Sequence, residues 1–122
     1  MDEPSLYGQV KASIEMTDLL QLFKYAGLQV QIRESSHFTN GCYLMVKYGK
    51  SHSCLIFEKI EQDEYLIRAD VFEADVICLS ELTALAETTS NVFSKSELQH
   101  RFEIYDPSDQ LVRYFHFNWQ HK

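Results

Sequence analysis

The side chains that could perform chemistry are few, and none of them forms a known catalytic or metal-binding motif. Four potential metal ligands lie close in sequence, at His37, Cys42, His52 and Cys54, but their spacing matches no standard zinc site. Cys78 lies just before an expected helix, where a thiol can become nucleophilic, and we interpret it as a structural residue. The chain has four glycines and no Gly-rich phosphate loop. We therefore expect no metal, no cofactor and no enzymatic activity.

Acidic residues outnumber basic ones, and several of them cluster. The net charge is −7, and the eleven Lys and Arg residues are scattered, which argues against direct nucleic-acid binding. Within residues 58–75 the acids are Glu58, Glu61, Asp63, Glu64, Asp70, Glu73 and Asp75. This segment is either an ordinary solvated surface or a docking face for a protein with a basic patch. Under the second interpretation, the first four of these acids are the candidate contacts.

The C-terminal segment 110–119 is rich in aromatic residues. Strand alternation would place Tyr114 and His116 on one side, and Phe115, Phe117 and Trp119 on the other. One side can belong to the core. If the other side is uncovered, or if the strand lies at a sheet edge, it offers a binding surface. Tyr114, His116 and Trp119 are therefore candidate partner contacts.

The length and composition of the chain indicate one small domain covering residues 1–122. The chain is 45% hydrophobic and has four glycines and two prolines, which suits regular elements around one core. Its three cysteines are an odd number without a CxxC pair, so we expect reduced thiols. The first residues, MDEPS, lack the features of a signal peptide, and no apolar run could span a membrane. We expect a cytoplasmic protein without membrane association.

Hydrophobic periodicity predicts the elements that position these residues. The expected strands cover residues 8–16, 28–34, 42–48, 53–60, 65–72, 100–106 and 110–119. The expected helices cover 18–26, capped by Thr17 and Asp18, and 81–90, capped by Ser80 and fraying early at its polar end. A single helix from Ser5 to Ala26 remains an alternative to the first strand and helix.

Short connections join these elements. Gly27 is expected to end the first helix, and Asn40-Gly41 and Gly49-Lys50 are expected in the connections on either side of strand 42–48. A turn is expected at residues 106–109, Asp-Pro-Ser-Asp. The expected fold is α+β, with a mainly antiparallel sheet of six or seven strands and two helices packed on one face.

One pattern occurs twice. Residues 14–22, IEMTDLLQL, are similar to residues 77–85, ICLSELTAL. Each copy reads as a strand end, a hydroxyl residue, an acid and an amphipathic helix. The pattern is explained either by two ordinary helix starts or by an internal duplication of a strand–helix–meander unit.

The order of elements resembles two families. The segments LLQLFKYAGLQVQI, YLIRADVF and HRFEIYDPSDQLVRY, with a second helix ending at Asn91, resemble YbjN-type sensory transduction regulators over about 19–114. That family has a fold like type III secretion chaperones, and the resemblance implies a noncatalytic, often dimeric, peptide-binding module.

The internal repeat, with GKSHSCLIFEKIEQDEYLIR and ICLSELTALAETTSN, is similar to one domain of a sliding DNA clamp over about 8–118. That resemblance implies a ring-forming oligomer whose helices line a hole. From the residues themselves we favour a noncatalytic protein-binding module, either chaperone-like, regulatory or an acidic inhibitor of the immunity-protein kind. A homodimer remains open, and a clamp-like nucleic-acid processing factor is the alternative.

Overall fold

The computed structural model describes residues 3–38, 40–48, 53–71 and 77–119. The strands are β1 (Ser5–Lys11), β2 (Gln29–Glu34), β3 (Cys42–Lys47), β4 (Ser53–Glu61), β5 (Glu64–Val71), β6 (Gln99–Tyr105) and β7 (Leu111–Phe117). The helices are α1 (Met16–Tyr25) and α2 (Leu79–Lys95). The expected turn at Gly49-Lys50 lies outside the described residues.

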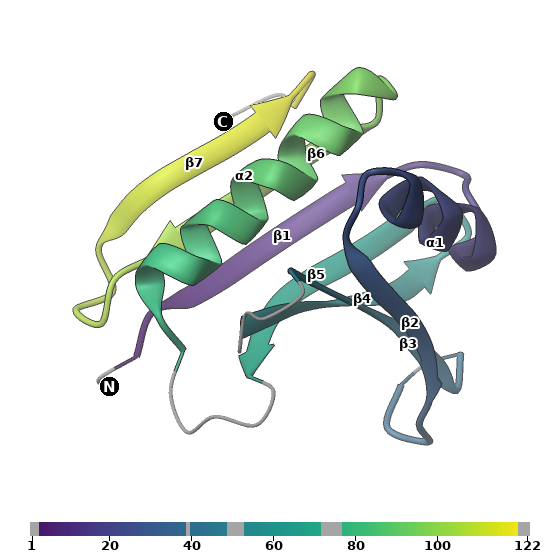
Figure 1. Ribbon diagram of the computed structural model, residues 1–122, viewed down its shortest axis with the longest axis horizontal. Helices are drawn as coiled ribbons and strands as arrows, with labels where there is room; N and C mark the ends of the chain where they lie inside the picture. Colours follow the sequence, from purple (N-terminus) through teal and green to yellow (C-terminus); the bar gives the residue numbers. More distant parts are fainter. Residues whose placement is uncertain (1–2, 39, 49–52, 72–76, 120–122) are drawn as a thin grey trace.

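Within the described residues, seven strands form one sheet in the order β2-β3-β4-β5-β1-β6-β7, and every neighbouring pair is antiparallel. Both helices of this part of the chain pack on the same face of the sheet, where they share one core (Figure 1). The expected α+β fold, with a mainly antiparallel sheet and two helices, is confirmed. The other face of the sheet carries no helix among the described residues.

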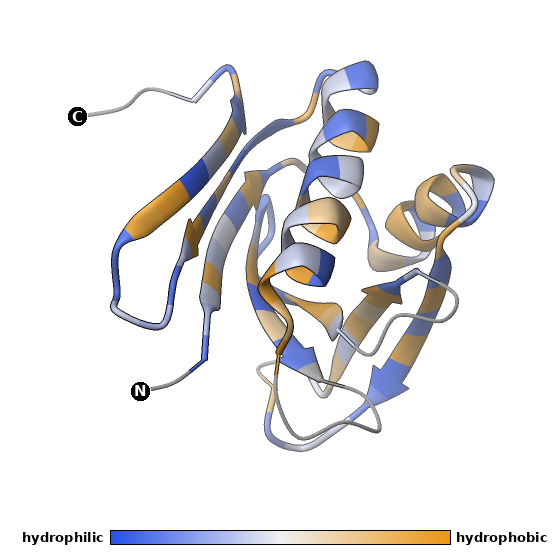
Figure 2. Cartoon of the chain, turned by 60° about the vertical axis from the view of Figure 1, so that its left-hand side comes forward, coloured by the Kyte–Doolittle hydropathy of each residue, from blue (hydrophilic) through white to orange (hydrophobic). Residues whose placement is uncertain are grey.

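Alternation along the strands determines which residues face the helices. Figure 2 shows hydrophobic and hydrophilic residues alternating along several strands. The buried strand side chains of the main core are Leu6, Val10, Leu44, Val46, Leu55, Phe57, Tyr65, Ile67, Phe102 and Ile104. Phe93 of α2 lies among the rings of Phe23, Phe57 and Phe102, at centroid distances of 5.5, 6.0 and 6.2 Å. Gly8 permits this packing, because a Cβ there would lie 2.8 Å from the Phe102 ring.

The first strand begins and ends earlier than residues 8–16, and the alternative of one helix from Ser5 to Ala26 is wrong. Residues 12–15 leave the sheet although the apolar alternation continues through them. Their main chain forms hydrogen bonds with the β4–β5 turn and with a β5 side chain. Ala12 N donates to Asp63 O at 2.9 Å, and the Tyr65 hydroxyl donates to Ile14 O at 2.6 Å. Helix α1 then starts at Met16, and the expected capping by Thr17 and Asp18 is absent.

The second helix extends to Lys95, so the expected fraying after residue 90 is wrong. Two of its polar residues, Thr89 and Ser90, are buried, and the hydroxyl of each has a hydrogen-bond partner. Thr89 Oγ1 donates to Leu85 O at 2.8 Å, and Ser90 Oγ lies 2.7 Å from His100 Nε2. The helix begins at Leu79 with Cys78 as the N-cap residue and no side-chain capping bond, so the expected cap at Ser80 is wrong, because Ser80 already lies in the first turn.

The remaining strands lie within two residues of their expected ranges. Gly27 and Gly41 have φ angles of 89° and 74°, the left-handed region in which glycine is favoured. The turn at residues 106–109 is confirmed, because Asp109 N donates to Asp106 O at 2.9 Å. The connections predicted from turn residues therefore fold as expected wherever the structure describes them.

The two halves of the internal repeat occupy the sheet differently. Helix α1 connects β1 to β2, which are separated by β5, β4 and β3, whereas α2 connects β5 to β6 across β1 alone. Three strands follow α1 before β5, and two strands follow α2. The structure thus contains two strand–helix–strand units with different crossovers around a central β1–β5 pair.

Candidate functional site

The helix-free face of the sheet brings together residues from five strands. Strand pairing aligns one row across β4, β5, β1, β6 and β7, formed in that order by Glu58, Leu66, Gln9, Arg101 and His116. Directly paired residues in an antiparallel sheet point to the same side, so all five belong to this face. The neighbouring row contains Ile56, Arg68, Tyr7, Glu103 and Tyr114. Sequence-predicted contacts from distant segments therefore share one surface.

Arg101 lies at the centre of the β1–β6–β7 part of this face. Its Nε and Nη2 atoms donate to Gln9 Oε1 at 3.0 and 2.6 Å, and Nη1 lies 3.1 Å from Glu103 Oε2. The same guanidinium is 5.3 Å from the ring centre of Tyr7 and 5.1 Å from that of Trp119. Arg101 thus joins β1 to β6 and fixes two aromatic rings by cation–π contact.

Trp119 lies on a different side from the one that its sequence position predicts. Strand β7 ends at Phe117, and Asn118 has a φ angle of 55°, which interrupts the alternation. Trp119 therefore reaches the helix-free face, where Lys11 Nζ lies 5.5 Å from its ring centre. Its expected placement with Phe115 and Phe117 is wrong, since those two rings face the helices.

Tyr114 and His116 lie on the helix-free face, as expected. Their rings stack with centroids 4.9 Å apart and an interplanar angle of 28°. On the opposite side of β7, Phe117 stacks on His100 at 6.4 Å, and Phe115 packs against the main core. One side of β7 is therefore core and the other is surface. The surface formed by Tyr7, Arg101, Tyr114, His116 and Trp119 is called the aromatic face below.

The four predicted acidic contacts divide into two pairs. Glu61 and Asp63 are exposed where β4 turns into β5. Glu58 and Glu64 are half-buried on the helix-free face, and the Glu64 carboxylate accepts a hydrogen bond from the Gln9 amide. Asp70 lies at the other end of β5, opposite Cys54, and Glu73 and Asp75 lie outside the described residues. The acidic run is therefore not one continuous surface.

Two further acids, which no sequence pattern indicated, lie at the start of α1, after the segment that packs against the β4–β5 turn. Residues 12–15 pack against this turn, and the start of α1 follows them, which brings in Glu15 and Asp18. Lys59 Nζ lies 3.8 Å from Glu15 Oε2. Burial, then the carboxylates of Glu15 and Asp18, raise the pKa of Tyr65 to about 12. The acids of the β4–β5 turn and of the start of α1, Glu15, Asp18, Glu61, Asp63 and Glu64, are together called the acidic corner.

The acidic corner is connected to the aromatic face through β1. Glu64 of β5 is the direct cross-strand partner of Lys11, and Lys11 in turn lies over the Trp119 ring. Gln9 also connects the two surfaces, since its amide nitrogen donates to Glu64 and its amide oxygen accepts from Arg101. The two predicted features therefore meet at one end of the sheet. Sequence alone offered no signal for this, because β1 contributes the connecting residues.

The connection between β2 and β3 covers another part of the helix-free face. The Phe38 ring packs against Tyr43 in a tilted arrangement with centroids 4.6 Å apart, and the Arg68 guanidinium lies 5.4 Å from the Phe38 ring centre. Beneath them lies a second small core of Met45, Cys54 and Ile56. Between this region and the aromatic face is a hollow of about 230 Å³, lined in part by Tyr7, Glu58 and Leu66.

The thiols do not assemble with other ligands in the described part of the chain. No group of three His, Cys, Asp or Glu side chains there could hold a metal ion, and His52 lies outside the described residues. Burial, then Asp70, raise the pKa of Cys54 to about 11, while Lys47 and Arg33 act in the opposite direction. Cys78 is exposed, and hydrogen bonds from the Ser80 hydroxyl and from backbone N–H groups lower its pKa.

In its described residues, the chain is a single-sheet α+β protein with two helices on one face of the sheet and an aromatic opposite face on which no helix lies. In comparisons with known proteins, no family model, curated protein or solved structure matched the chain. The resemblances to YbjN-type regulators and to a clamp domain therefore stay predictions. Neither helix in the described ranges has the length and apolar character needed to cross a membrane.

Proposed function

We propose that this protein is a noncatalytic binding module that recognises a protein partner with its aromatic face. The observation that carries the proposal is the arrangement around Arg101, which holds Tyr7 and Trp119 on the side of the sheet without helices. Aromatic and arginine side chains supply most of the affinity at many protein interfaces. Rings already fixed before binding lose less conformational entropy when a partner orders them. The geometry therefore supports recognition by a prearranged surface.

The acidic corner indicates that the surface of the proposed partner is basic. Glu61 and Asp63 are exposed and lie next to the aromatic face through Lys11 and Glu64. Acidic groups beside an interface accelerate association with a basic surface, mainly by raising the association rate constant. We infer that the partner has a basic patch. The present protein would bind it in the cytoplasm and act as a chaperone-like, regulatory or inhibitor-type protein. A homodimer through the same face is a further form of this proposal.

The clamp-like alternative depends on the helix layer instead. A clamp requires positive charge on the helices that face DNA. In the described helices, α1 has Lys24 against Asp18, and α2 has Lys95 against Glu81 and Glu87. This balance supports protein binding over DNA encirclement. Size-exclusion chromatography with light scattering tests the alternative, because a clamp-like factor forms a ring and a monomer or dimer contradicts it.

The direct test is affinity capture from the lysate of the source organism with matched variants. Trp119→Ala removes a ring from the aromatic face, whereas Tyr25→Ala removes a ring that is 97% exposed on α1. We expect a partner bound by the wild type to be retained by Tyr25→Ala and lost by Trp119→Ala. Equal retention by both variants, or no captured partner, would show that the aromatic face is not the interface.

The acidic corner has its own measurement once a partner is identified. Reversing Glu61, Asp63 and Glu64 to lysine should reduce the association rate constant about tenfold at low salt, with a smaller effect at high salt. The matched pair of single variants is Glu61→Lys and Glu87→Lys, because each reverses one exposed glutamate, the first in the corner and the second away from it on α2. An association rate that is the same in both variants contradicts the steering role.

A further inference from the structure

The hollow of about 230 Å³ on the helix-free side of the sheet lies beside the aromatic face. Its lining side chains come from three neighbouring strands, β4, β5 and β1, and belong to two aligned rows of strand pairs. On this side of the sheet they are Tyr7, Ile56, Glu58, Leu66 and Arg68. Because Tyr7 also belongs to the aromatic face, a partner that binds this face reaches the hollow.

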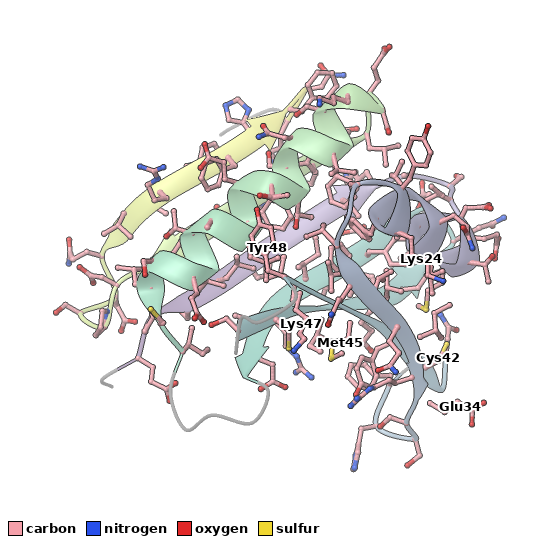
Figure 3. The ribbon with its side chains drawn as sticks, viewed as in Figure 1. Lys24, Glu34, Cys42, Met45, Lys47 and Tyr48 are labelled. Carbon is pink, nitrogen blue, oxygen red and sulfur yellow. The ribbon has the colours of Figure 1, made fainter. Side chains whose placement is uncertain are left out.

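The bottom of the hollow is apolar, and longer side chains surround it. Ile56 is 5% exposed and Leu66 is half-buried, whereas Tyr7 is 40% exposed and Arg68 is exposed. Ile56 also belongs to the second small core together with Met45, which Figure 3 labels beside the ribbon of β2. An apolar bottom inside a rim of polar and aromatic groups is typical of the pockets that hold anchor residues at protein interfaces.

Two side chains of the rim are already held in place by neighbours. The Arg101 guanidinium lies 5.3 Å from the ring centre of Tyr7. The Arg68 guanidinium lies 5.4 Å from the ring centre of Phe38. Each of these cation–π contacts favours one arrangement of a rim side chain. The hollow therefore needs little rearrangement to accept a group of matching shape.

The volume of the hollow indicates which group it accepts. Pockets for whole small-molecule ligands measure roughly 300–1,000 Å³, so a hollow of about 230 Å³ is too small for them. A cavity of about 150 Å³ holds a benzene ring. There is thus room for one phenyl ring with its methylene group. The Tyr7 ring and the Arg68 guanidinium at the rim favour an aromatic group over an aliphatic one.

We propose that this hollow is the anchor pocket of the aromatic face and accepts a phenylalanine side chain of the partner protein. The inference rests on the function proposed above, which supplies the partner. The acidic corner adds a requirement, since Glu61 and Asp63 are exposed in the turn that precedes β5. Asp63 lies three residues before Leu66, about 10 Å along an extended chain. A lysine or arginine two positions from the phenylalanine therefore reaches the corner with its long side chain.

The probe is the capped peptide acetyl-Lys-Ser-Phe-Ser-Lys-amide, which carries a lysine on both sides of the ring, so that either chain direction can bind. Three matched peptides have Ala in place of Phe, Leu in place of Phe, or Glu in place of both Lys. Binding to the isotope-labelled protein is followed by methyl chemical shifts. Nuclear Overhauser effects between the peptide ring and the Leu66 methyl groups locate the bound ring.

The matched protein variants are Leu66→Trp and Leu111→Trp. The first fills the hollow, and the second places the same ring at a leucine that is 52% exposed on β7. We expect Leu66→Trp to abolish binding and Leu111→Trp to leave it unchanged, with circular dichroism checking that both variants are folded. The comparison of peptides on the wild type tests the proposal even if Leu66→Trp does not fold.

The wild type should bind the phenylalanine peptide with a Kd of about 1 mM and the alanine peptide about tenfold more weakly. The leucine peptide should bind about threefold more weakly, and so should the glutamate peptide at low salt. Equal binding of the phenylalanine and alanine peptides, ring contacts away from Leu66, or no binding at about 10 mM peptide overturns the proposal. A leucine peptide that binds as tightly contradicts the aromatic occupant.

The inference and the proposed function fail separately. If these peptides do not bind while capture of a partner still depends on Trp119, the hollow is not the anchor pocket and the proposed function stands. If the phenylalanine peptide occupies the hollow while Trp119→Ala captures the partner as well as the wild type does, the role of the aromatic face is wrong and the hollow remains a binding site.

Discussion

Replacing Arg101 with glutamine removes the guanidinium that joins β1, β6 and Trp119 on the aromatic face. The substitution removes the hydrogen bonds to Gln9 and Glu103 and the cation–π contacts with Tyr7 and Trp119. Glutamine is shorter and uncharged, so it can replace at most one of the hydrogen bonds.

The expected cost follows from the burial of these groups. The side chains of Arg101 and Glu103 are 24% and 17% exposed, so their ion pair is only partly screened by solvent. Glu103 keeps the hydrogen bond from the Tyr105 hydroxyl at 2.8 Å and is not left without a donor. Combining the lost hydrogen bonds and ring contacts, we expect the free energy of unfolding to fall by about 2–3 kcal/mol. The melting temperature should fall by about 10 °C.

Urea unfolding followed by far-ultraviolet circular dichroism measures the free energy, and Trp119 fluorescence reports on the face itself. Trp119 is the only tryptophan of the chain, so its emission should shift to the red when the guanidinium is removed. Arg113→Gln is the matched control, because Arg113 is exposed on β7 and lies 5.5 Å from the Phe115 ring centre. We expect it to cost about 0.5 kcal/mol without a spectral shift.

Equal stability of the two arginine variants, with unchanged Trp119 emission in both, is the result that contradicts this prediction. Such a result would mean that Arg101 does not organise the aromatic face. The premise of a prearranged surface under "Proposed function" would then be lost, whereas a partner could still be sought by capture.

Two further predictions concern buried and exposed titrating groups. Burial lowers the pKa of His100, so the unfolded chain binds more protons below about pH 6.5, and stability should fall as the pH drops from there to the folded-state pKa. Urea titrations from pH 7.5 to 5 should show this slope in His116→Gln and a flatter one in His100→Gln; equal slopes contradict it. In the native protein, iodoacetamide should modify exposed Cys78 before buried Cys54, whose pKa is about 11. Once urea unfolds the chain, this difference in labelling rate should disappear. Mass spectrometry that finds Cys54 labelled as early as Cys78 in the native protein contradicts the second.

The sequence was sufficient for features that depend on neighbouring residues. Alternation predicted the strands and separated Tyr114 and His116 from Phe115 and Phe117 on the two sides of β7, because side chains of a strand point to opposite faces in turn. Gly27 and the turn at 106–109 were predictable, since their backbone conformations depend on residue type. The absence of a known motif also led to the interpretation of a binding surface, which stays a prediction.

Only the tertiary structure decided which residues meet. Helix α2 extends past its polar residues because Ser90 has His100 as a partner, and that partner comes from another element. Trp119 joins Tyr114 because one left-handed residue, Asn118, interrupts the period of two. The acidic corner combines residues from separate elements. Sheet order and long-range pairing determine these groupings, and they depend on the packing of the whole chain, which local periodicity does not encode.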